Sequence, residues 1–187
     1  MAAGILALLA SGCRTTVEYG DETSSKPIST DFGSSDLQQI AAKMVDSMLA
    51  DDVLQDISAE GPPLLIVDSV KNKTLQHIDT EAVTDSIRTK LIRSRKFSFQ
   101  DRTTEGALSE ELAYQQVASQ APVASGQQDA PHYMLTSNLS QIEQEQGRLT
   151  DVYYKFTMNL RDLKSGRLIL ADEKEIRKQK TRSIFGG

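Results

Sequence analysis

The chain has 187 residues, a net charge of −5 and 39% hydrophobic residues, a size that fits one domain with a flanking segment. This hydrophobic fraction is too low for a polytopic membrane protein. With one cysteine and two histidines, the chain can form neither an intrachain disulfide nor a histidine-rich metal site.

Cys13, the single cysteine, lies directly after a short apolar segment, residues 4–12. The segment is far too short to span a bilayer, which takes about 20 residues, but it is long enough for the hydrophobic region of a signal peptide. It ends in small residues, as a secretory cleavage signal does. We therefore expect residues 1–12 to be a signal peptide, truncated at its start because no Lys or Arg precedes Cys13. The alternative is a frayed apolar terminus or a small core element with an incidental buried cysteine.

The arrangement around Cys13 resembles a bacterial lipobox. The resemblance implies that the Cys13 thiol is lipidated with diacylglycerol and that the new N-terminus is acylated after cleavage. Three acyl chains hold a protein at a membrane effectively permanently. Arg14 follows the cysteine, where an aspartate would retain a lipoprotein at the inner membrane. The resemblance therefore implies attachment to the outer membrane, with the protein facing the periplasm.

Residues 14–35 are poor in apolar side chains and show neither a helical nor a strand period. We expect residues 13–35 to be the lipidated cysteine and a flexible linker. A flexible chain of about 22 residues has a root-mean-square span of roughly 25 to 28 Å and an extended reach of about 75 Å. A globular domain over residues 36–179 and a basic tail over residues 180–187 complete the expected organisation.

Three segments have helical periodicity. The first begins at Asp36, a good N-cap, and carries apolar residues three or four apart as far as Leu49. The second begins around Asp79 and ends near Ser94, and the third covers residues 105–119. Basic residues toward the end of the second helix complement the negative C-terminal end of a helix, although they could also bind an anion.

The remaining elements have strand character. Residues 64–70 form a continuous apolar run, typical of a central buried strand, and residues 97–100 alternate like a short strand. Residues 133–139 and 151–160 alternate between apolar and polar, with a polar turn at 143–148 between them, and residues 168–177 form the returning strand. The pattern predicts an antiparallel meander whose middle strand has one solvated face. The fold class is α/β, in an α+β-like order: a mixed sheet with a C-terminal meander and about three helices packed on it.

Motifs for catalysis and cofactor binding are largely missing from the sequence. His77 and His132 are isolated, Cys13 is assigned to the lipid, and there is no glycine-rich phosphate loop or nucleophile elbow. We therefore expect a protein that is not an enzyme and that uses no cofactor, no metal and no small-molecule substrate. Its acidic net charge argues against general nucleic-acid binding.

A protein that works by binding needs a docking surface, and two regions are candidates. Tyr153 and Lys155 lie on the polar face of the expected middle strand. Lys174 and Arg177 lie in the last 27 residues, which hold eight basic and four acidic residues, a net charge of +4 against −9 for the first 160. Such basic residues could instead protect a solvated edge strand from pairing.

Four segments, in this order, resemble the penicillin-binding protein activator LpoB family. They are residues 64–74 (LLIVDSVKNKT), 87–97 (IRTKLIRSRKF), 132–135 (HYML) and 158–170 (MNLRDLKSGRLIL). The resemblance covers most of residues 37–179, behind the lipobox.

The resemblance implies a mixed α/β domain similar to the N-terminal domain of TolB, carried by an outer-membrane lipoprotein that binds a bifunctional class A penicillin-binding protein. Binding would stimulate glycan polymerisation and peptide cross-linking by favouring the active conformation of the synthase. One alternative is a structural or secretion-linked periplasmic lipoprotein with a domain similar to those of curli-type export pores. Another is a periplasmic enzyme, which would need a pocket with a convergent acid and base or a metal.

Overall fold

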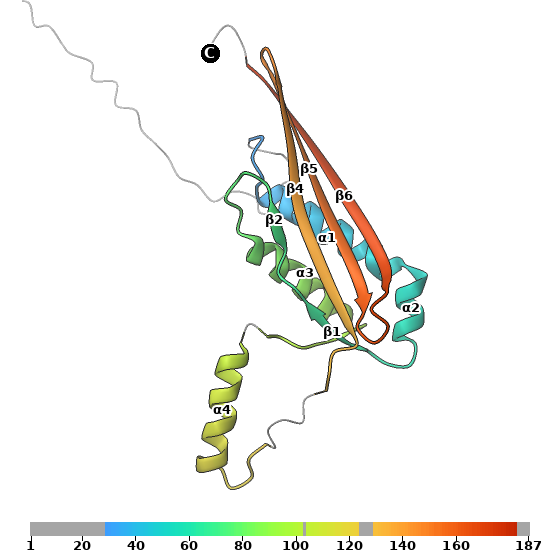
Figure 1. Ribbon diagram of the computed structural model, residues 1–187, viewed down its shortest axis with the longest axis vertical. Helices are drawn as coiled ribbons and strands as arrows, with labels where there is room; N and C mark the ends of the chain where they lie inside the picture. Colours follow the sequence, from blue (N-terminus) through green and yellow to red (C-terminus); the bar gives the residue numbers. More distant parts are fainter. Residues whose placement is uncertain (1–28, 103, 124–128, 183–187) are drawn as a thin grey trace, which may run out of the picture.

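The computed structural model describes residues 29–102, 104–123 and 129–182, which form four helices and a six-stranded sheet (Figure 1). The expected signal peptide, Cys13 and most of the linker lie outside the described residues, as does most of the basic tail. The helices are α1 (Ser34–Ala50), α2 (Asp52–Ser58), α3 (Thr80–Ser94) and α4 (Glu105–Ala118). The strands are β1 (Leu64–Val67), β2 (Lys71–Lys73), β3 (Ser98–Phe99), β4 (Tyr133–Gln146), β5 (Leu149–Asp162) and β6 (Leu168–Thr181).

The sheet is mixed, and its strand order is β3-β1-β4-β5-β6. β1 pairs in parallel with β3 and with the first residues of β4, and the short β2 pairs in parallel with β4 further along. β4, β5 and β6 form a long antiparallel meander. The predicted mixed sheet with a C-terminal antiparallel meander is therefore confirmed.

Three of the helices begin within two residues of the predicted positions. The side chain of Asp79 accepts hydrogen bonds from the backbone amides of Glu81 and Ala82 at the start of α3, as an N-cap does, and Arg95 ends the helix in a left-handed conformation with φ 59°. Helix α2 was not predicted, because seven residues are too few to show a helical period. It begins where the Asp51 side chain accepts a hydrogen bond from the Val53 amide.

The predicted polar turn between β4 and β5 is too long. Residues 143–146 continue strand β4, and only Gly147 and Arg148 connect it to β5. Gly147 has φ 60°, a conformation that the first turn residue of a two-residue hairpin requires and that glycine adopts without strain. The polar composition of residues 143–146 suggested a turn, but a ribbon exposed to solvent also accommodates polar residues on both faces.

Helices α1 and α3 lie side by side over one face of the sheet (Figure 1). Apolar side chains from α1, α2 and α3 meet every second residue of β5 in a single core. Its largest fully buried side chains include Ile40, Met44, Leu54, Ile87, Tyr154 and Phe156. None of the helices in the described ranges has the length and apolar character needed to cross a bilayer.

Helix α4 forms where it was predicted but does not cover the sheet. It contributes no buried residue, and it lies beyond the β1 end of the sheet (Figure 1). Val117 is 90% exposed and Leu108 is 41% exposed. Among the described residues, the helices that supply buried side chains are therefore α1, α2 and α3, and the predicted helix over residues 105–119 is not one of those packed on the sheet.

A buried ion pair joins the start of the domain to the edge strand β6. Lys178 Nζ lies 2.5 Å from Asp36 Oδ2, and the two side chains are 5% and 2% exposed. Lys178 Nζ also donates to the Asp31 carbonyl, and Asp36 Oδ2 accepts a hydrogen bond from the Gly33 amide at 2.8 Å. These bonds hold residues 31–36 against the sheet, so the chain enters the domain at a fixed place.

Replacing Lys178 by alanine should lower the free energy of unfolding by about 3 to 5 kcal/mol, because Asp36 is then left buried without its counter-charge. Chemical denaturation of the two proteins measures the difference. The matched control is Lys180→Ala, two residues along the same strand, where the side chain is exposed and the change should stay within about 0.5 kcal/mol. Equal losses for the two variants would contradict the role assigned to the buried pair.

Candidate docking surface

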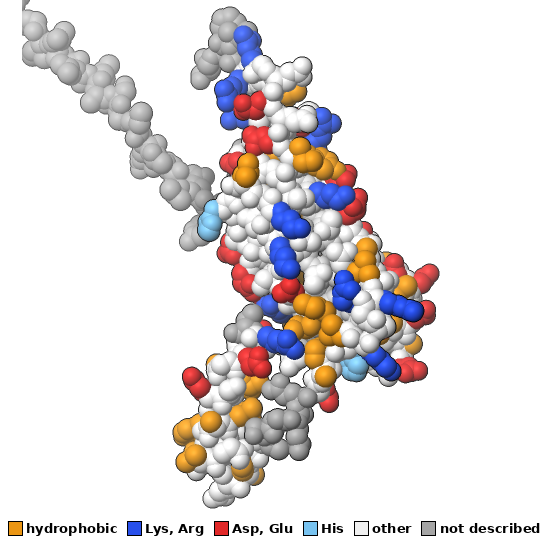
Figure 2. All heavy atoms as spheres, viewed as in Figure 1, with side chains coloured by type: hydrophobic (Ala, Val, Ile, Leu, Met, Phe, Trp, Pro, Cys, Tyr) orange, Lys and Arg blue, Asp and Glu red, His pale blue; other side chains and the backbone are white. Residues whose placement is uncertain are grey.

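The face of the sheet opposite the helices is open, and it carries the polar half of β5. Along β5 the even-numbered residues from Thr150 to Leu160 are buried and the odd-numbered residues point to the other side. Tyr153 and Lys155 are therefore on the open face, as predicted. Figure 2 shows this face, with basic side chains over the strands and hydrophobic side chains toward the two ends of the sheet.

The structure brings Arg177 onto the same face but not Lys174. Arg177 lies directly opposite Tyr153 in the β5–β6 pairing, so the two side chains share the open face. Lys174 lies opposite Phe156, which is completely buried beneath the helices. Of the four candidate residues, Tyr153, Lys155 and Arg177 thus form one cluster, while Lys174 belongs to the helix-covered side.

Arg177 is held in place by Asp151 on the neighbouring strand. Its Nε lies 3.0 and 3.1 Å from the two carboxylate oxygens, and its Nη2 lies 2.6 Å from Oδ2. This bidentate geometry lowers the pKa of Asp151 and raises that of Arg177, in both cases mainly through the hydrogen bond. Arg177 therefore offers a positioned planar group, with its charge already balanced.

Lys155 and Tyr153 are engaged by the two glutamates of β6. Lys155 Nζ lies 2.5 Å from Glu173 and 4.0 Å from Glu175, and the hydrogen bond to Glu173 raises the pKa of Lys155. The Tyr153 hydroxyl donates to Glu175, which raises the pKa of Tyr153 to about 12, with smaller contributions from burial and from the glutamate charges. On β5 and β6 the open face is thus an ordered network of paired charges.

Two further basic residues on this face, Lys71 and Lys73, were not singled out from the sequence. They lie on β2, beside Asn138 and Ser140 of β4, and residues paired in this way point to the same side of a sheet. The apolar run Leu64–Val70 suggested one strand that ends before them. The alternating lysines in Lys71-Asn72-Lys73 were the available signal, but three residues are too few to establish a strand period.

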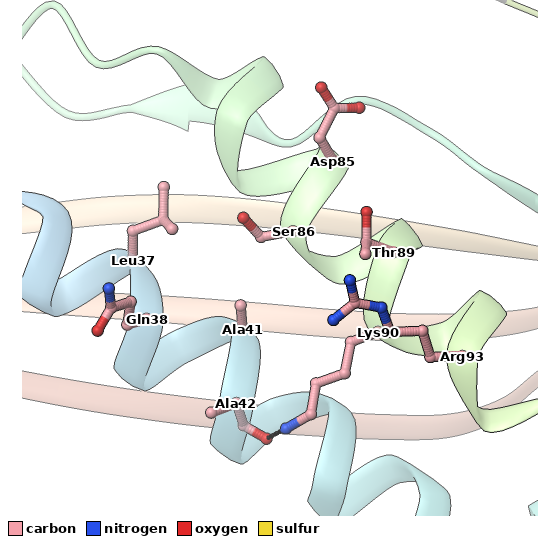
Figure 3. A pocket seen from close by; sticks show the side chains of 9 residues that line it. All are labelled: Leu37, Gln38, Ala41, Ala42, Asp85, Ser86, Thr89, Lys90 and Arg93. Atoms are coloured by element: carbon pink, nitrogen blue, oxygen red, sulfur yellow. Dashed lines mark hydrogen bonds between the residues drawn. The ribbon is translucent and has the colours of Figure 1, made fainter. Parts of the chain in front are cut away.

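On the helix side, an open groove of about 580 Å³ lies between α1 and α3 (Figure 3). Small side chains such as Ala41 and Thr89 line it, and Lys90 reaches across to donate to the Ala42 carbonyl at 2.7 Å. Lys90 also pairs with Asp46. These contacts tie the two helices together, so Lys90, one of the basic residues toward the end of α3, serves helix packing.

The described part of the chain contains no group of three or more His, Cys, Asp or Glu side chains placed to hold a metal ion. In the groove between α1 and α3, Asp85 and Lys90 are each engaged in a salt bridge, and the third charged residue that lines it is Arg93. On the open sheet face, the described residues offer hydrogen-bonding groups, charges and the aromatic side chain of Tyr153.

A family model described as peptidoglycan-synthase activator LpoB matches residues 36–176, about three quarters of the chain. The chain belongs to the LpoB family. The family activates peptidoglycan synthases, and it is a regulatory rather than a catalytic family. The matched residues take in the helix-covered core and most of the open face, while Arg177 lies one residue beyond the match.

The chain is similar, at low identity, to solved structures of LpoB domains and of one other lipoprotein. The C-terminal domain of LpoB from Salmonella enterica is 18% identical over 76% of this chain and 99% of that chain, with a TM-score of 0.47. The same domain from Escherichia coli is 20% identical over 75% and 98% of the two chains, with a TM-score of 0.46. Lipoprotein GNA1162 from Neisseria meningitidis is 12% identical over 65% and 87%, with a TM-score of 0.42. No curated protein matches the chain.

The charge network on the open face of this LpoB family member predicts the titration of Tyr153. Glu175→Gln keeps a hydrogen-bonding group but removes the negative charge that disfavours the tyrosinate, so the pKa of Tyr153 should fall from about 12 toward the ordinary 10. Absorbance titration of tyrosinate measures the shift, with Tyr153→Phe identifying which step belongs to this residue. A titration curve unchanged by Glu175→Gln would show that the two side chains do not interact in solution.

Proposed function

We propose that this protein is an outer-membrane lipoprotein that binds the periplasmic part of a bifunctional class A penicillin-binding protein and stimulates its synthesis of peptidoglycan. The observation that supports the proposal most strongly is the match to the LpoB family over residues 36–176. In this proposal the protein performs no chemistry of its own. Its binding energy favours the active conformation of the synthase, by as much as its affinities for the two conformations differ.

The open sheet face is the proposed docking surface for the synthase. Three features support this choice over the helix side. The face is continuous over β4, β5 and β6, its side chains Tyr153, Lys155 and Arg177 are held in fixed positions by neighbours, and none of the four described helices covers it (Figure 1). Positioned side chains lose little conformational freedom when a partner binds, which favours affinity.

We propose that a lipid attached to Cys13 anchors the protein to the outer membrane. Fifteen residues separate Cys13 from Ser29, where the described chain begins. Fully extended, fifteen residues reach at most about 54 Å. Because the contacts of Asp36 and Asp31 fix where the chain enters the domain, this length and the extent of the domain together set how far the docking surface can stand from the membrane. The proposal therefore requires a synthase domain that comes within that combined distance of the outer membrane.

The proposal predicts that the purified full-length protein raises the rate of glycan polymerisation by one of the host's class A penicillin-binding proteins severalfold. Consumption of the lipid-linked precursor measures the rate, and co-purification measures binding. Lys155→Glu should weaken both effects, because it places a negative charge beside Glu173 and Glu175. Absence of binding and of any rate change with every class A synthase of the host would exclude the proposed function.

The Cys13→Ala variant separates anchoring from activation. In detergent solution this variant should stimulate the synthase as the wild type does, since the docking surface is unchanged. In cells it should lose the incorporation of a labelled fatty acid, because the thiol that would carry the lipid is gone. Incorporation that survives the substitution would show that Cys13 is not the lipidation site.

A further inference from the structure

The loop after β2 presents a leucine almost completely to solvent. The side chain of Leu75 is 97% exposed. The loop is ordered by its own side chains: the Thr74 amide donates to Asn72 Oδ1 at 2.9 Å, the Gln76 amide donates to Thr74 Oγ1 at 3.1 Å, and Asn72 Nδ2 donates to the Gln76 carbonyl at 2.8 Å. The exposed leucine therefore sits on a backbone of defined shape.

Gln76 fastens this loop to the body of the domain. Its Nε2 donates to the Tyr154 hydroxyl at 2.7 Å, and its Oε1 accepts from the Phe32 amide at 3.0 Å. Tyr154 is completely buried, and its ring packs against Phe32 with centroids 5.7 Å apart. Leu75 is thus one residue away from a side chain anchored in the core, which makes it a pre-organised apolar contact rather than the tip of a loose loop.

Lys71 and Lys73, the strand residues just before this loop, carry positive charge on the open face without a counter-charge beside it. Within the described ranges, the side chain of neither lysine makes a hydrogen bond or an ion pair. Their neighbours in the sheet, Asn138 and Ser140, are uncharged.

Following the paired residues across the sheet from β2 through β4 and β5 to β6 leads from Lys71 to Glu173 and from Lys73 to Glu175. These two carboxylates lie three strands away from the lysines, about 14 Å at the usual strand spacing. That distance exceeds the screening length of roughly 8 to 10 Å in physiological salt. These carboxylates, Glu173 and Glu175, are already engaged by Lys155 and Tyr153. An incoming partner therefore meets three carboxylates on β5 and β6 that are already engaged by Lys155, Arg177 and Tyr153, and two lysine side chains on β2 without a counter-charge among the described residues.

The open face adds a second exposed apolar side chain close to the lysines. Ile142 is 60% exposed, and it is the next residue of β4 after Ser140 to point to the open face. On that face it lies directly opposite Tyr153. Apolar contacts at the centre of a charged surface are where protein interfaces concentrate their binding energy.

We propose that Lys71, Lys73 and Leu75 determine partner recognition, and that they fit an acidic protein surface with an apolar pocket for Leu75. This inference rests on the proposed function and identifies the partner surface as part of the synthase. Charge complementarity favours an acidic protein over an anionic membrane. Two lysines and one leucine attract a lipid surface only weakly, and the net charge of −5 opposes that attraction.

The test compares binding of the full-length protein to the class A synthase that it stimulates. Leu75→Ser and the double variant Lys71→Glu/Lys73→Glu should each weaken binding at least about tenfold. The double variant should also lose most of the salt dependence of binding, a readout that a merely structural role would not change.

The matched control variants carry substitutions on the helix-covered side of the sheet or in α4, which lies off the sheet. Val117→Ser removes a similarly exposed apolar side chain from α4, and Lys43→Glu/Lys174→Glu makes the same charge change away from the open face. Both controls should bind as the wild type does. Denaturation curves establish that each variant is folded, as expected for positions that are exposed or, at Lys174, half-buried.

The outcomes separate this inference from the proposed function. A wild type that binds and stimulates, with unchanged affinity in Leu75→Ser and Lys71→Glu/Lys73→Glu, would overturn the inference and leave the function standing. A wild type that binds no synthase would overturn both. Binding of the Cys13→Ala protein to phosphatidylglycerol vesicles, lost in Lys71→Glu/Lys73→Glu, would show that the lysines read a membrane instead.

Discussion

The structure depends on the strict two-residue alternation of β5. Every even-numbered side chain from Thr150 to Leu160 is buried, and its odd-numbered neighbours stay on the opposite side. The register with β4 and β6 extends that division across the meander, because residues opposite each other point to the same face. A one-residue slip would place Tyr153 and Lys155 in the core and expose Phe156, so the hydrophobic pattern fixes both the core and the open face at once.

The two faces of the sheet therefore have different roles. The covered face holds α1 and α3 by apolar contacts and by Lys90, which joins the two helices. On the open face, the charges of β5 and β6 are engaged with one another, whereas the side chains of Lys71 and Lys73 on β2 have no partner among the described residues. Gln76, which follows the exposed Leu75 in the sequence, connects the loop after β2 to the core. It hydrogen-bonds both to Phe32, where the chain enters the domain, and to the buried Tyr154. The place where the chain enters the domain and the proposed recognition loop therefore share one anchoring residue.

Much of the fold could be predicted from the sequence, because long elements carry a clear period. The helices around Met44 and Ile87 and the alternation of β5 were predicted for that reason. The short elements α2 and β2 have no measurable period, so Lys71 and Lys73 were not recognised as neighbours of Lys155. Periodicity identified α4 as a helix but could not show that it lies off the sheet. The candidate residues Tyr153 and Lys155 followed from the period of β5, whereas the face of Lys174 depends on the register with Phe156, which composition does not reveal.

Labelling of lysine side chains in the presence and absence of the synthase tests the central claim most directly, namely that the open sheet face is the docking surface. The full-length protein is acetylated alone and in complex, and the modified positions are identified by mass spectrometry. The account predicts that Lys71, Lys73 and Lys155 become protected in the complex while Lys43 and Lys174 remain reactive. Protection of Lys43 and Lys174, with Lys71, Lys73 and Lys155 unchanged, would contradict it.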